Sequence, residues 1–149
     1  MTRLLRHLRP FAALCATLLI FGGTQAAGPT LDPAQAYDQA NAGKLTLIDI
    51  RTPSEWEQTG VAPIAHRIDM QDPAGPDGFA DKVLAELHGD RTAPVALICR
   101  SGNRSGRMQK ELSRRGFTNV YSVQEGMSGS SAGPGWIERG LPTQPCPDC

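Results

Sequence analysis

The stretch from residue 94 to residue 107 constrains the fold most, because it joins a predicted buried strand to a predicted helix through a cysteine. Its first part, Val95–Ile98, is a short apolar run after a proline, a pattern typical of a strand buried on both faces. Met108 and Leu112 then lie four residues apart, on one face of a predicted helix whose other positions are mostly polar. Cys99 therefore lies where a buried strand gives way to the N-terminus of a helix.

The surroundings of Cys99 favour the reactive form of a thiol. Backbone N–H groups of a tight, glycine-containing loop converge on a concavity, and the dipole of the following helix adds positive potential there. Arg100 and Arg104 add fixed positive charge to the same loop. Because the thiolate is the nucleophilic form of cysteine, we interpret Cys99 as a reactive residue rather than as a structural cysteine beside a basic turn.

The spacing of the loop separates two kinds of cysteine chemistry. Four residues lie between Cys99 and Arg104. In cysteine phosphatases the arginine that closes the loop comes one position later, where this chain has Ser105. The shorter loop makes a smaller cradle, which suits a terminal sulfur atom better than a phosphoryl group. The spacing thus disfavours a phosphatase or an arsenate reductase.

Three segments of the chain resemble the rhodanese family of sulfurtransferases. Residues 99–105, Cys-Arg-Ser-Gly-Asn-Arg-Ser, are similar to the active-site loop of single-domain members. Residues 49–56 resemble the family segment in which Asp-x-Arg is followed by a Glu four positions after the Arg. The C-terminal part of the family pattern is matched by Gly126, Trp136, Gly140, Leu141 and Pro142. The resemblance extends from about residue 32 to residue 142, with departures at His66, at Glu125 and in a longer glycine- and serine-rich loop, 128–135.

This resemblance implies a double-displacement sulfurtransferase. Cys99 would take a sulfane sulfur from a small anion such as thiosulfate, form a persulfide, and pass the sulfur to a thiol or to cyanide. Asp49 would support the active loop, and Arg51 would help to position the site. No metal and no organic cofactor is implied. The residues expected to bind the substrate and the persulfide are Arg100, Ser101, Gly102, Asn103, Arg104 and Ser105.

The order of apolar and polar segments predicts an α/β fold with a mostly parallel central sheet and helices on both faces. In such sheets sites form at the C-terminal ends of strands, and both Cys99 and the segment 49–51 lie at such ends. Helices are predicted for 33–43, for a short segment after Thr52, for 79–87 and after the cysteine loop, with strands at 45–50, 64–70, 95–98 and 120–123 and a loop at 71–78.

The N-terminal segment has the form of a secretory signal peptide. Residues 1–10 carry three arginines and no acidic residue, residues 11–21 are apolar, and small residues follow with a cleavage position after Ala26. We therefore expect a signal peptide at 1–26, a single rhodanese-like domain at 27–143 and a tail at 144–149, in a periplasmic or secreted protein. The alternative is an uncleaved membrane anchor.

The charge of the mature chain fits small anions better than polymers. Without the three arginines of the signal, 12 basic residues face 15 acidic ones, a formal charge of −3. The positive loop after Cys99 would then be a local patch on a mildly acidic protein. The sequence predicts no nucleic-acid partner, and no membrane partner once the signal is cleaved.

Cysteines 146 and 149 form a C-x-x-C pair in the tail. We weigh three interpretations: a local disulfide, a redox pair that resolves a persulfide on Cys99, and half of a zinc site. The second would make the protein a thiol–disulfide or persulfide relay. A further alternative, a non-catalytic binding module, conflicts with the intact nucleophile and the complete basic loop.

Overall fold

The computed structural model describes residues 28–149, so the predicted signal peptide lies outside the described part of the chain. Strands and helices alternate along these residues, as the sequence predicts for an α/β fold. None of the described helices combines the length and the apolar character that crossing a membrane requires. The strands are β1 (Thr30–Leu31), β2 (Thr46–Asp49), β3 (His66–Arg67), β4 (Val95–Ile98) and β5 (Val120–Val123), and the helices are α1 (Pro33–Asn41), α2 (Pro53–Thr59), α3 (Gly75–Glu86), α4 (Asn103–Arg114) and α5 (Gly135–Glu138).

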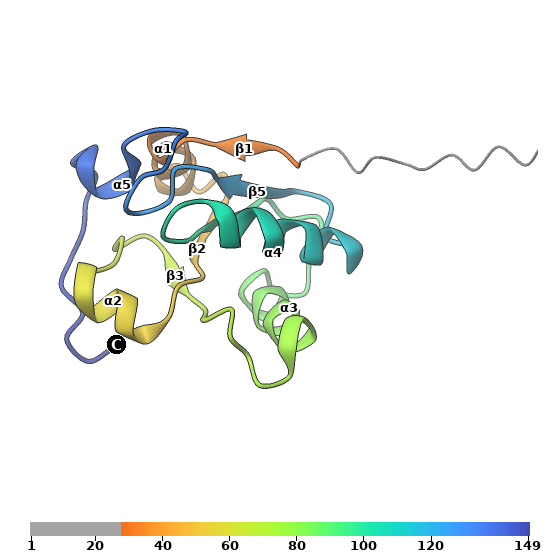
Figure 1. The fold of residues 1–149 in the computed structure, drawn as a ribbon. Helices are drawn as coiled ribbons and strands as arrows, with labels where there is room; N and C mark the ends of the chain where they lie inside the picture. Colours follow the sequence, from red (N-terminus) through yellow and green to blue (C-terminus); the bar gives the residue numbers. More distant parts are fainter. Residues whose placement is uncertain (1–27) are drawn as a thin grey trace, which may run out of the picture.

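The five strands form one parallel sheet in the order β1-β5-β4-β2-β3 (Figure 1). β4 lies at its centre, with Ile98 opposite Asp49 of β2 and Leu97 opposite Ser122 of β5. All four residues of β4 are buried, as the apolar run predicts. The register places the segments that follow β2 and β4 side by side, at the C-terminal ends of the two strands.

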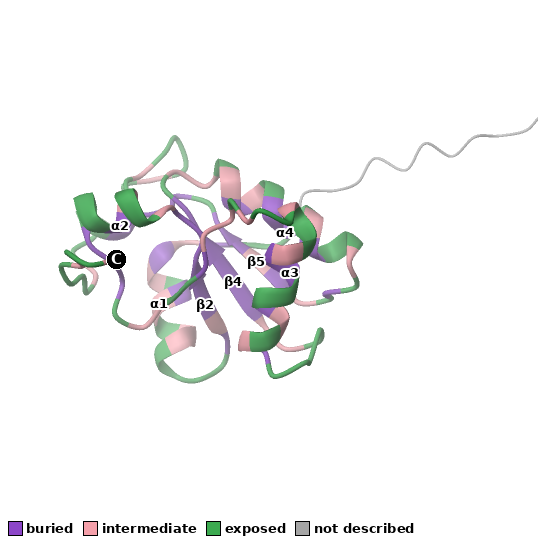
Figure 2. Cartoon of the chain, turned by 90° about the horizontal axis from the view of Figure 1, so that it is seen from below, coloured by how far each residue is buried: buried purple, intermediate pink, exposed green. Residues whose placement is uncertain are grey.

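Helices cover both faces of the sheet, and a separate apolar core fills each face. Figure 2 shows the buried residues concentrated on the strands, with α1 on one side and α3 and α4 on the other. Neighbouring strand residues point to opposite faces, so Leu47 and Ile48 enter different cores. The core beneath α3 and α4 includes Ile48, Phe79, Val83, Leu97, Met108 and Leu112, and the core beneath α1 and α5 includes Ala36, Leu47, Ile98, Val123, Met127 and Trp136.

Two helices begin with the capping boxes that the sequence contains. Asp32 caps α1 and accepts a hydrogen bond from the amide of Gln35 at 2.8 Å. Thr52 caps α2, and the carboxylate of Glu55 accepts the Thr52 amide at 3.1 Å. Both helices have proline in their first turn, where the missing N–H costs nothing. The predicted starts of α1 and α2 are thus confirmed.

Other boundaries differ from the prediction. The predicted strand at 64–70 is reduced to two paired residues in β3, and the predicted loop at 71–78 ends early because α3 already begins at Gly75. The prolines of this segment suggested a loop, but Pro76 lies in the first turn of α3, where proline is favoured. The short elements β1 and α5 were not predicted, since neither is long enough to show periodicity.

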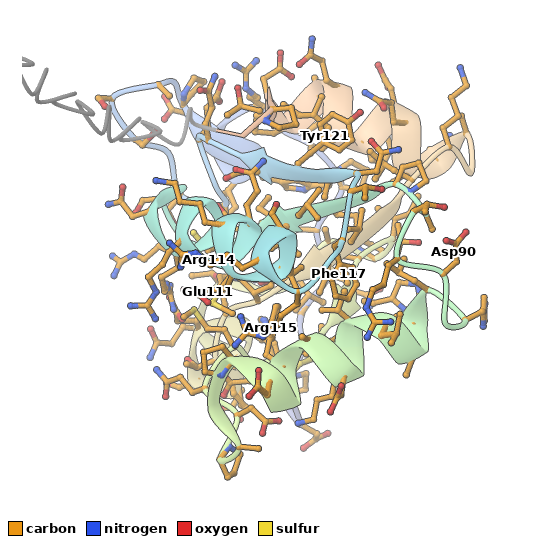
Figure 3. All side chains as sticks on the ribbon, turned by 90° about the vertical axis from the view of Figure 1, so that its right-hand side faces the viewer. Asp90, Glu111, Arg114, Arg115, Phe117 and Tyr121 are labelled. Carbon is orange, nitrogen blue, oxygen red and sulfur yellow. A yellow bond between two sulfur atoms is a disulfide. The ribbon has the colours of Figure 1, made fainter. Side chains whose placement is uncertain are left out.

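Arg115 links α4 to α3 at the surface (Figure 3). Its guanidinium donates to Asp77 and, within the end of α4, to Glu111, at distances of 2.7 and 2.8 Å. Exposed pairs of this kind contribute only about 0–1 kcal/mol each. The apolar core beneath the two helices therefore holds them on the sheet.

Candidate active site

Cys99 directly follows β4 and is 1% exposed. Its Sγ accepts hydrogen bonds from the backbone N–H groups of Gly102 at 3.2 Å and Ser105 at 3.4 Å. The second of these amides belongs to the first turn of α4, whose dipole is positive at this end. Two N–H groups aimed at one sulfur atom can stabilise a negative charge there or on a sulfur attached to it.

The turn after Cys99 depends on a glycine at position 102. Gly102 has a φ of 86°, in the left-handed region, and it directly precedes α4. A Cβ atom at this position would lie 2.0 Å from the carbonyl oxygen of Gln124. Only glycine therefore allows the chain to turn back so that its amide reaches Sγ.

The segment after β5 holds the cysteine loop from the other side. The amide of Met127 donates to the Cys99 carbonyl at 2.8 Å, and the amide of Ser128 donates to the Arg100 carbonyl at 2.9 Å. Gly126 has a φ of 68°, and a Cβ there would lie 2.5 Å from the carbonyl carbon of Arg100. The loop is thus fixed by its own helix and by a second segment pressed against it.

Two buried serines form a hydroxyl chain beside the thiol. Ser105 Oγ lies 3.6 Å from Cys99 Sγ, donates to the Gly102 carbonyl at 2.9 Å, and lies 2.9 Å from Ser122 Oγ. Ser105 was predicted as a loop residue, whereas Ser122 on β5 was missed. Its only sequence signal is a small hydroxyl at an inward position of the apolar strand Val120–Val123.

Arg104 is paired with a carboxylate from a different element. Its guanidinium binds both carboxylate oxygens of Glu55, with Nη1 to Oε2 at 2.7 Å. The hydrogen bonds to Arg104 lower the pKa of Glu55 to about 2. The same pair raises the pKa of Arg104, and the negative charge of the nearby Cys99 raises it further. The positive charge of Arg104 is therefore largely balanced, and its guanidinium fastens α4 to α2 beside the cysteine loop.

Asp49 and Arg51 form a buried ion pair at the end of β2. They are 0% and 1% exposed, and Arg51 Nη2 lies 2.6 Å from Asp49 Oδ2. Arg51 also donates to the Gly60 carbonyl at 2.8 Å and to Thr59 Oγ1 at 2.5 Å, so it ties the C-terminal end of α2 to the end of β2. The hydrogen bonds of this pair offset the free-energy cost of burying two charges. The pair therefore positions α2 and does not present a free charge to a substrate.

A small cavity of about 70 Å³ lies beside the cysteine loop. Arg100 contributes an exposed cationic side chain to it, and Ser128 contributes the start of the 128–135 loop. Ser101 is half-buried, and Asn103 is exposed at the start of α4. Arg100 is thus the arginine of the loop that is placed to meet an incoming anion. The full lining consists of Arg51, Glu55, Gln58, Thr59, Arg100 and Ser128.

Glu125 orders the long loop that borders this cavity. Its buried carboxylate accepts the Gly135 amide at 2.9 Å and the guanidinium of Arg139 at 2.8 and 2.6 Å. The pair with Arg139 lowers the pKa of Glu125, and so does the Gly135 amide. Glu125 and the longer loop are both departures from the family pattern. The carboxylate of Glu125 connects them, because it binds Gly135 and Arg139 at the two ends of α5.

The C-terminal cysteines contact Arg67 of β3, whereas Cys99 contacts residues of its own loop. Cys146 and Cys149 are joined in a disulfide, while Cys99 is a free thiol. The tail is docked, because Gln144 and Val61 exchange two backbone hydrogen bonds of 2.9 Å. Within residues 28–149 there is no group of three or more His, Cys, Asp or Glu side chains placed to hold a metal ion.

Comparison with known proteins agrees with this geometry. A family model described as a rhodanese-like domain matches residues 32–132. An uncharacterized protein of Rickettsia conorii is 30% identical over 114 residues, which cover 74% of this chain and 92% of the relative. A probable adenylyltransferase/sulfurtransferase of Mycobacterium tuberculosis, MoeZ, is 30% identical over 118 residues, covering 78% of this chain and 28% of the relative.

Solved structures with related sequences have the same fold. The crystal structure of Rv0390 from M. tuberculosis has a TM-score of 0.62 and 28% identity, and covers 80% of this chain and 98% of that one. The polysulfide-sulfur transferase homodimer of Wolinella succinogenes has a TM-score of 0.59 and 26% identity, with 80% of each chain covered. The parallel sheet, the cysteine loop and these matches together show that the chain belongs to the rhodanese-like domain family.

Proposed function

We propose that this protein is a sulfurtransferase that moves a sulfane sulfur from a donor such as thiosulfate to a thiol or to cyanide through a persulfide on Cys99. The observation that carries the proposal is the cradle around Sγ, with backbone amides at 3.2 and 3.4 Å in a buried loop. The names of two relatives, a probable sulfurtransferase and a polysulfide-sulfur transferase, support this kind of chemistry.

In the first step the Cys99 thiolate attacks the terminal sulfur of thiosulfate. A new S–S bond forms, the S–S bond of the donor breaks, and sulfite leaves with the electron pair. Cys99 is nearly fully buried, so the donor must reach into the loop with a single narrow atom, as a terminal sulfur can. The positive side chain of Arg100 beside the cavity would attract the anionic donor.

In the second step a thiolate or cyanide attacks the outer sulfur of the persulfide. The sulfur leaves as an acceptor persulfide or as thiocyanate, and Cys99 returns as the thiolate. The amides of Gly102 and Ser105 point at the sulfur in both steps, so they can stabilise the charge of the thiolate and of the persulfide without rearrangement. Neither step requires a metal or an organic cofactor.

The test is the thiosulfate:cyanide reaction of the wild type beside Cys99→Ser and a Cys146→Ser/Cys149→Ser double variant. We expect Cys99→Ser to abolish thiocyanate formation and the double variant to keep it. Turnover that survives in Cys99→Ser would overturn the proposal. Turnover that is lost in the double variant instead would favour a relay through the tail.

We also propose that the protein is exported to the periplasm or secreted. The support is the sequence of residues 1–26 alone. N-terminal sequencing of the protein from its native host is expected to begin at Ala27, and a start within residues 1–26 would contradict cleavage at this position.

A further inference from the structure

The tail disulfide is held against the edge of the sheet next to α2. After Gln144 pairs with Val61, the chain brings Cys146 and Cys149 beside Arg67 of β3. The C-terminus lies close to α2 in both ribbon views (Figures 1 and 2). Both cysteines are half-buried, so their sulfurs are packed on the domain and still reachable from solvent.

A guanidinium faces both sulfur atoms of this disulfide. Arg67 Nη1 donates to both Cys146 Sγ and Cys149 Sγ. The same guanidinium lies over the Trp56 ring, 5.9 Å from its centre, a cation–π contact that favours this position. None of the ion pairs within residues 28–149 includes Arg67, so no carboxylate is bound directly to its guanidinium. The carboxylates in the lining of the adjoining groove are those of Asp69 and Glu86.

This arrangement does little for a disulfide whose role is structural. The bond joins residues only three apart, and the stabilisation from closing so short a loop is small. A neutral disulfide also gains little from a cation. A thiolate gains much more, because a charged donor and a charged acceptor form the stronger class of hydrogen bond. The position of Arg67 therefore favours the reduced form of the pair.

We propose that Cys146, Cys149 and Arg67 form a second, redox-active site, which exchanges two electrons with a dithiol partner. A partner thiolate attacks one tail sulfur, forms a mixed disulfide and breaks the Cys146–Cys149 bond. The displaced thiolate is held by Arg67. The second partner thiol then loses its proton and attacks the mixed disulfide, which releases the other tail sulfur and leaves the partner oxidised. The two protons that the partner dithiol loses end on the two tail sulfurs, so the partner becomes a disulfide and the tail a dithiol.

A groove lies beside Arg67 on the side of α3. It has a volume of about 420 Å³ and is bordered by Arg67 and Trp56 on one side and by α3 on the other. Arg67 thus borders both the groove and the disulfide, whereas neither tail cysteine lines the groove itself. The lining consists of Trp56, Arg67, Ile68, Asp69, Lys82, Ala85 and Glu86.

The experiment uses the full chain with Cys15→Ser and Cys99→Ser, so that the tail holds its only two cysteines. Its disulfide is equilibrated with mixtures of reduced and oxidised dithiothreitol, and the thiols are trapped by alkylation and counted by mass. Because Cys99 is absent, the outcome does not depend on the sulfurtransferase proposal. Circular dichroism of each sample checks whether the fold persists.

Arg67→Met is expected to shift this equilibrium about tenfold toward the disulfide, the size of a lost hydrogen bond to a charged group. It should also move alkylation of the reduced tail to higher pH, since the thiolate loses its cation. Arg67→Lys should restore part of both effects. The matched control is Arg91→Met, which removes an arginine stacked 5.7 Å from the Phe117 ring and should change neither.

Two results would overturn the proposal. One is a disulfide that dithiothreitol does not reduce while the chain stays folded. The other is an Arg67→Met chain whose equilibrium and alkylation profile match those of the Arg91→Met control.

Discussion

Arg100 and Arg104 carry the same charge in the same loop, yet the fold gives them different partners. Arg104 is bound to the carboxylate of Glu55, whereas Arg100 is exposed beside the cavity. The sequence predicted substrate binding for both. The structure separates a fixed arginine that joins two helices from a free one that can attract an anion.

Arg100→Met is therefore expected to raise the KM for thiosulfate about tenfold, since one charged contact to the donor is lost. The kcat should change little, because the amides that face Sγ are backbone groups. Steady-state kinetics at low ionic strength measures both constants. The control is Arg107→Met, which removes an exposed arginine of α4 outside the cavity lining. Equal changes of KM in the two variants would contradict a direct contact of Arg100 with the donor, because they would reflect only the loss of one positive charge from the protein.

Glu55 makes stability depend on pH. Its pKa in the folded protein is about 2, below the ordinary 4.5, because Arg104 holds the charged form. The stabilisation is thus fully present above pH 4.5 and is lost as pH falls toward about 2. Solvent screens this partly exposed pair, so we expect Glu55→Gln to cost about 1 kcal/mol of unfolding free energy at neutral pH.

Denaturant unfolding at several pH values measures this contribution. The difference between wild type and Glu55→Gln should shrink as the pH is lowered through the same window. Glu57→Gln is the matched control, because Glu57 is exposed on the same helix. A difference that stays constant with pH would contradict an ionic role for Glu55.

The geometry of the cysteine loop depends on a strand, a left-handed turn and a helix that follow one another without a spacer. Gly102 is the residue on which this joint depends. In Gly102→Ala the left-handed backbone costs about 1–2 kcal/mol, and the clash with the Gln124 carbonyl adds about 1–3 kcal/mol. We expect lower stability and a loss of turnover, because the Gly102 amide moves away from Sγ.

Gly116→Ala provides the matched comparison. Gly116 has the same φ of 86°, but a Cβ there would meet its nearest atom at 3.7 Å, an ordinary contact. Thermal unfolding of both variants should show the larger loss for Gly102→Ala, and only that variant should lose turnover. Equal losses would mean that backbone strain, and not the packing of the loop, decides the outcome.

Local sequence signals predicted the elements that carry the site. Val95–Ile98 and Val120–Val123 were predicted with their observed bounds, since each is an apolar run between turn residues. The capping box at Thr52 and Glu55 was predicted because its partners lie three residues apart. These interactions depend on neighbours in the chain, so a single sequence reveals them.

Contacts between distant segments could not be predicted in this way. Arg104 and Glu55 are 49 positions apart, and Ser105 and Ser122 are 17 apart. Neither pair has a spacing that marks it, and only the register of β4 against β2 and β5 brings the partners together. The same holds for Arg67, whose contact with the tail spans 79 and 82 positions.

One buried arginine, Arg51, supports both the segment beside Cys99 and the segment on which the tail disulfide is docked. Arg51 holds the end of β2 beside the cysteine loop and donates to the Gly60 carbonyl at 2.8 Å. The next residue, Val61, pairs with Gln144 and so carries the tail. The molecule thus presents a free thiol at the carboxyl end of its central strand and a disulfide at the edge of its sheet.

We expect Cys99 itself to carry the transferred sulfur. Intact-protein and peptide mass spectrometry after exposure to thiosulfate alone, without an acceptor, tests it most directly. We expect a gain of one sulfur atom on the peptide that contains Cys99, its removal by cyanide, and no gain in Cys99→Ser. A wild-type protein that gains no sulfur on Cys99 from thiosulfate or from a polysulfide would contradict the account.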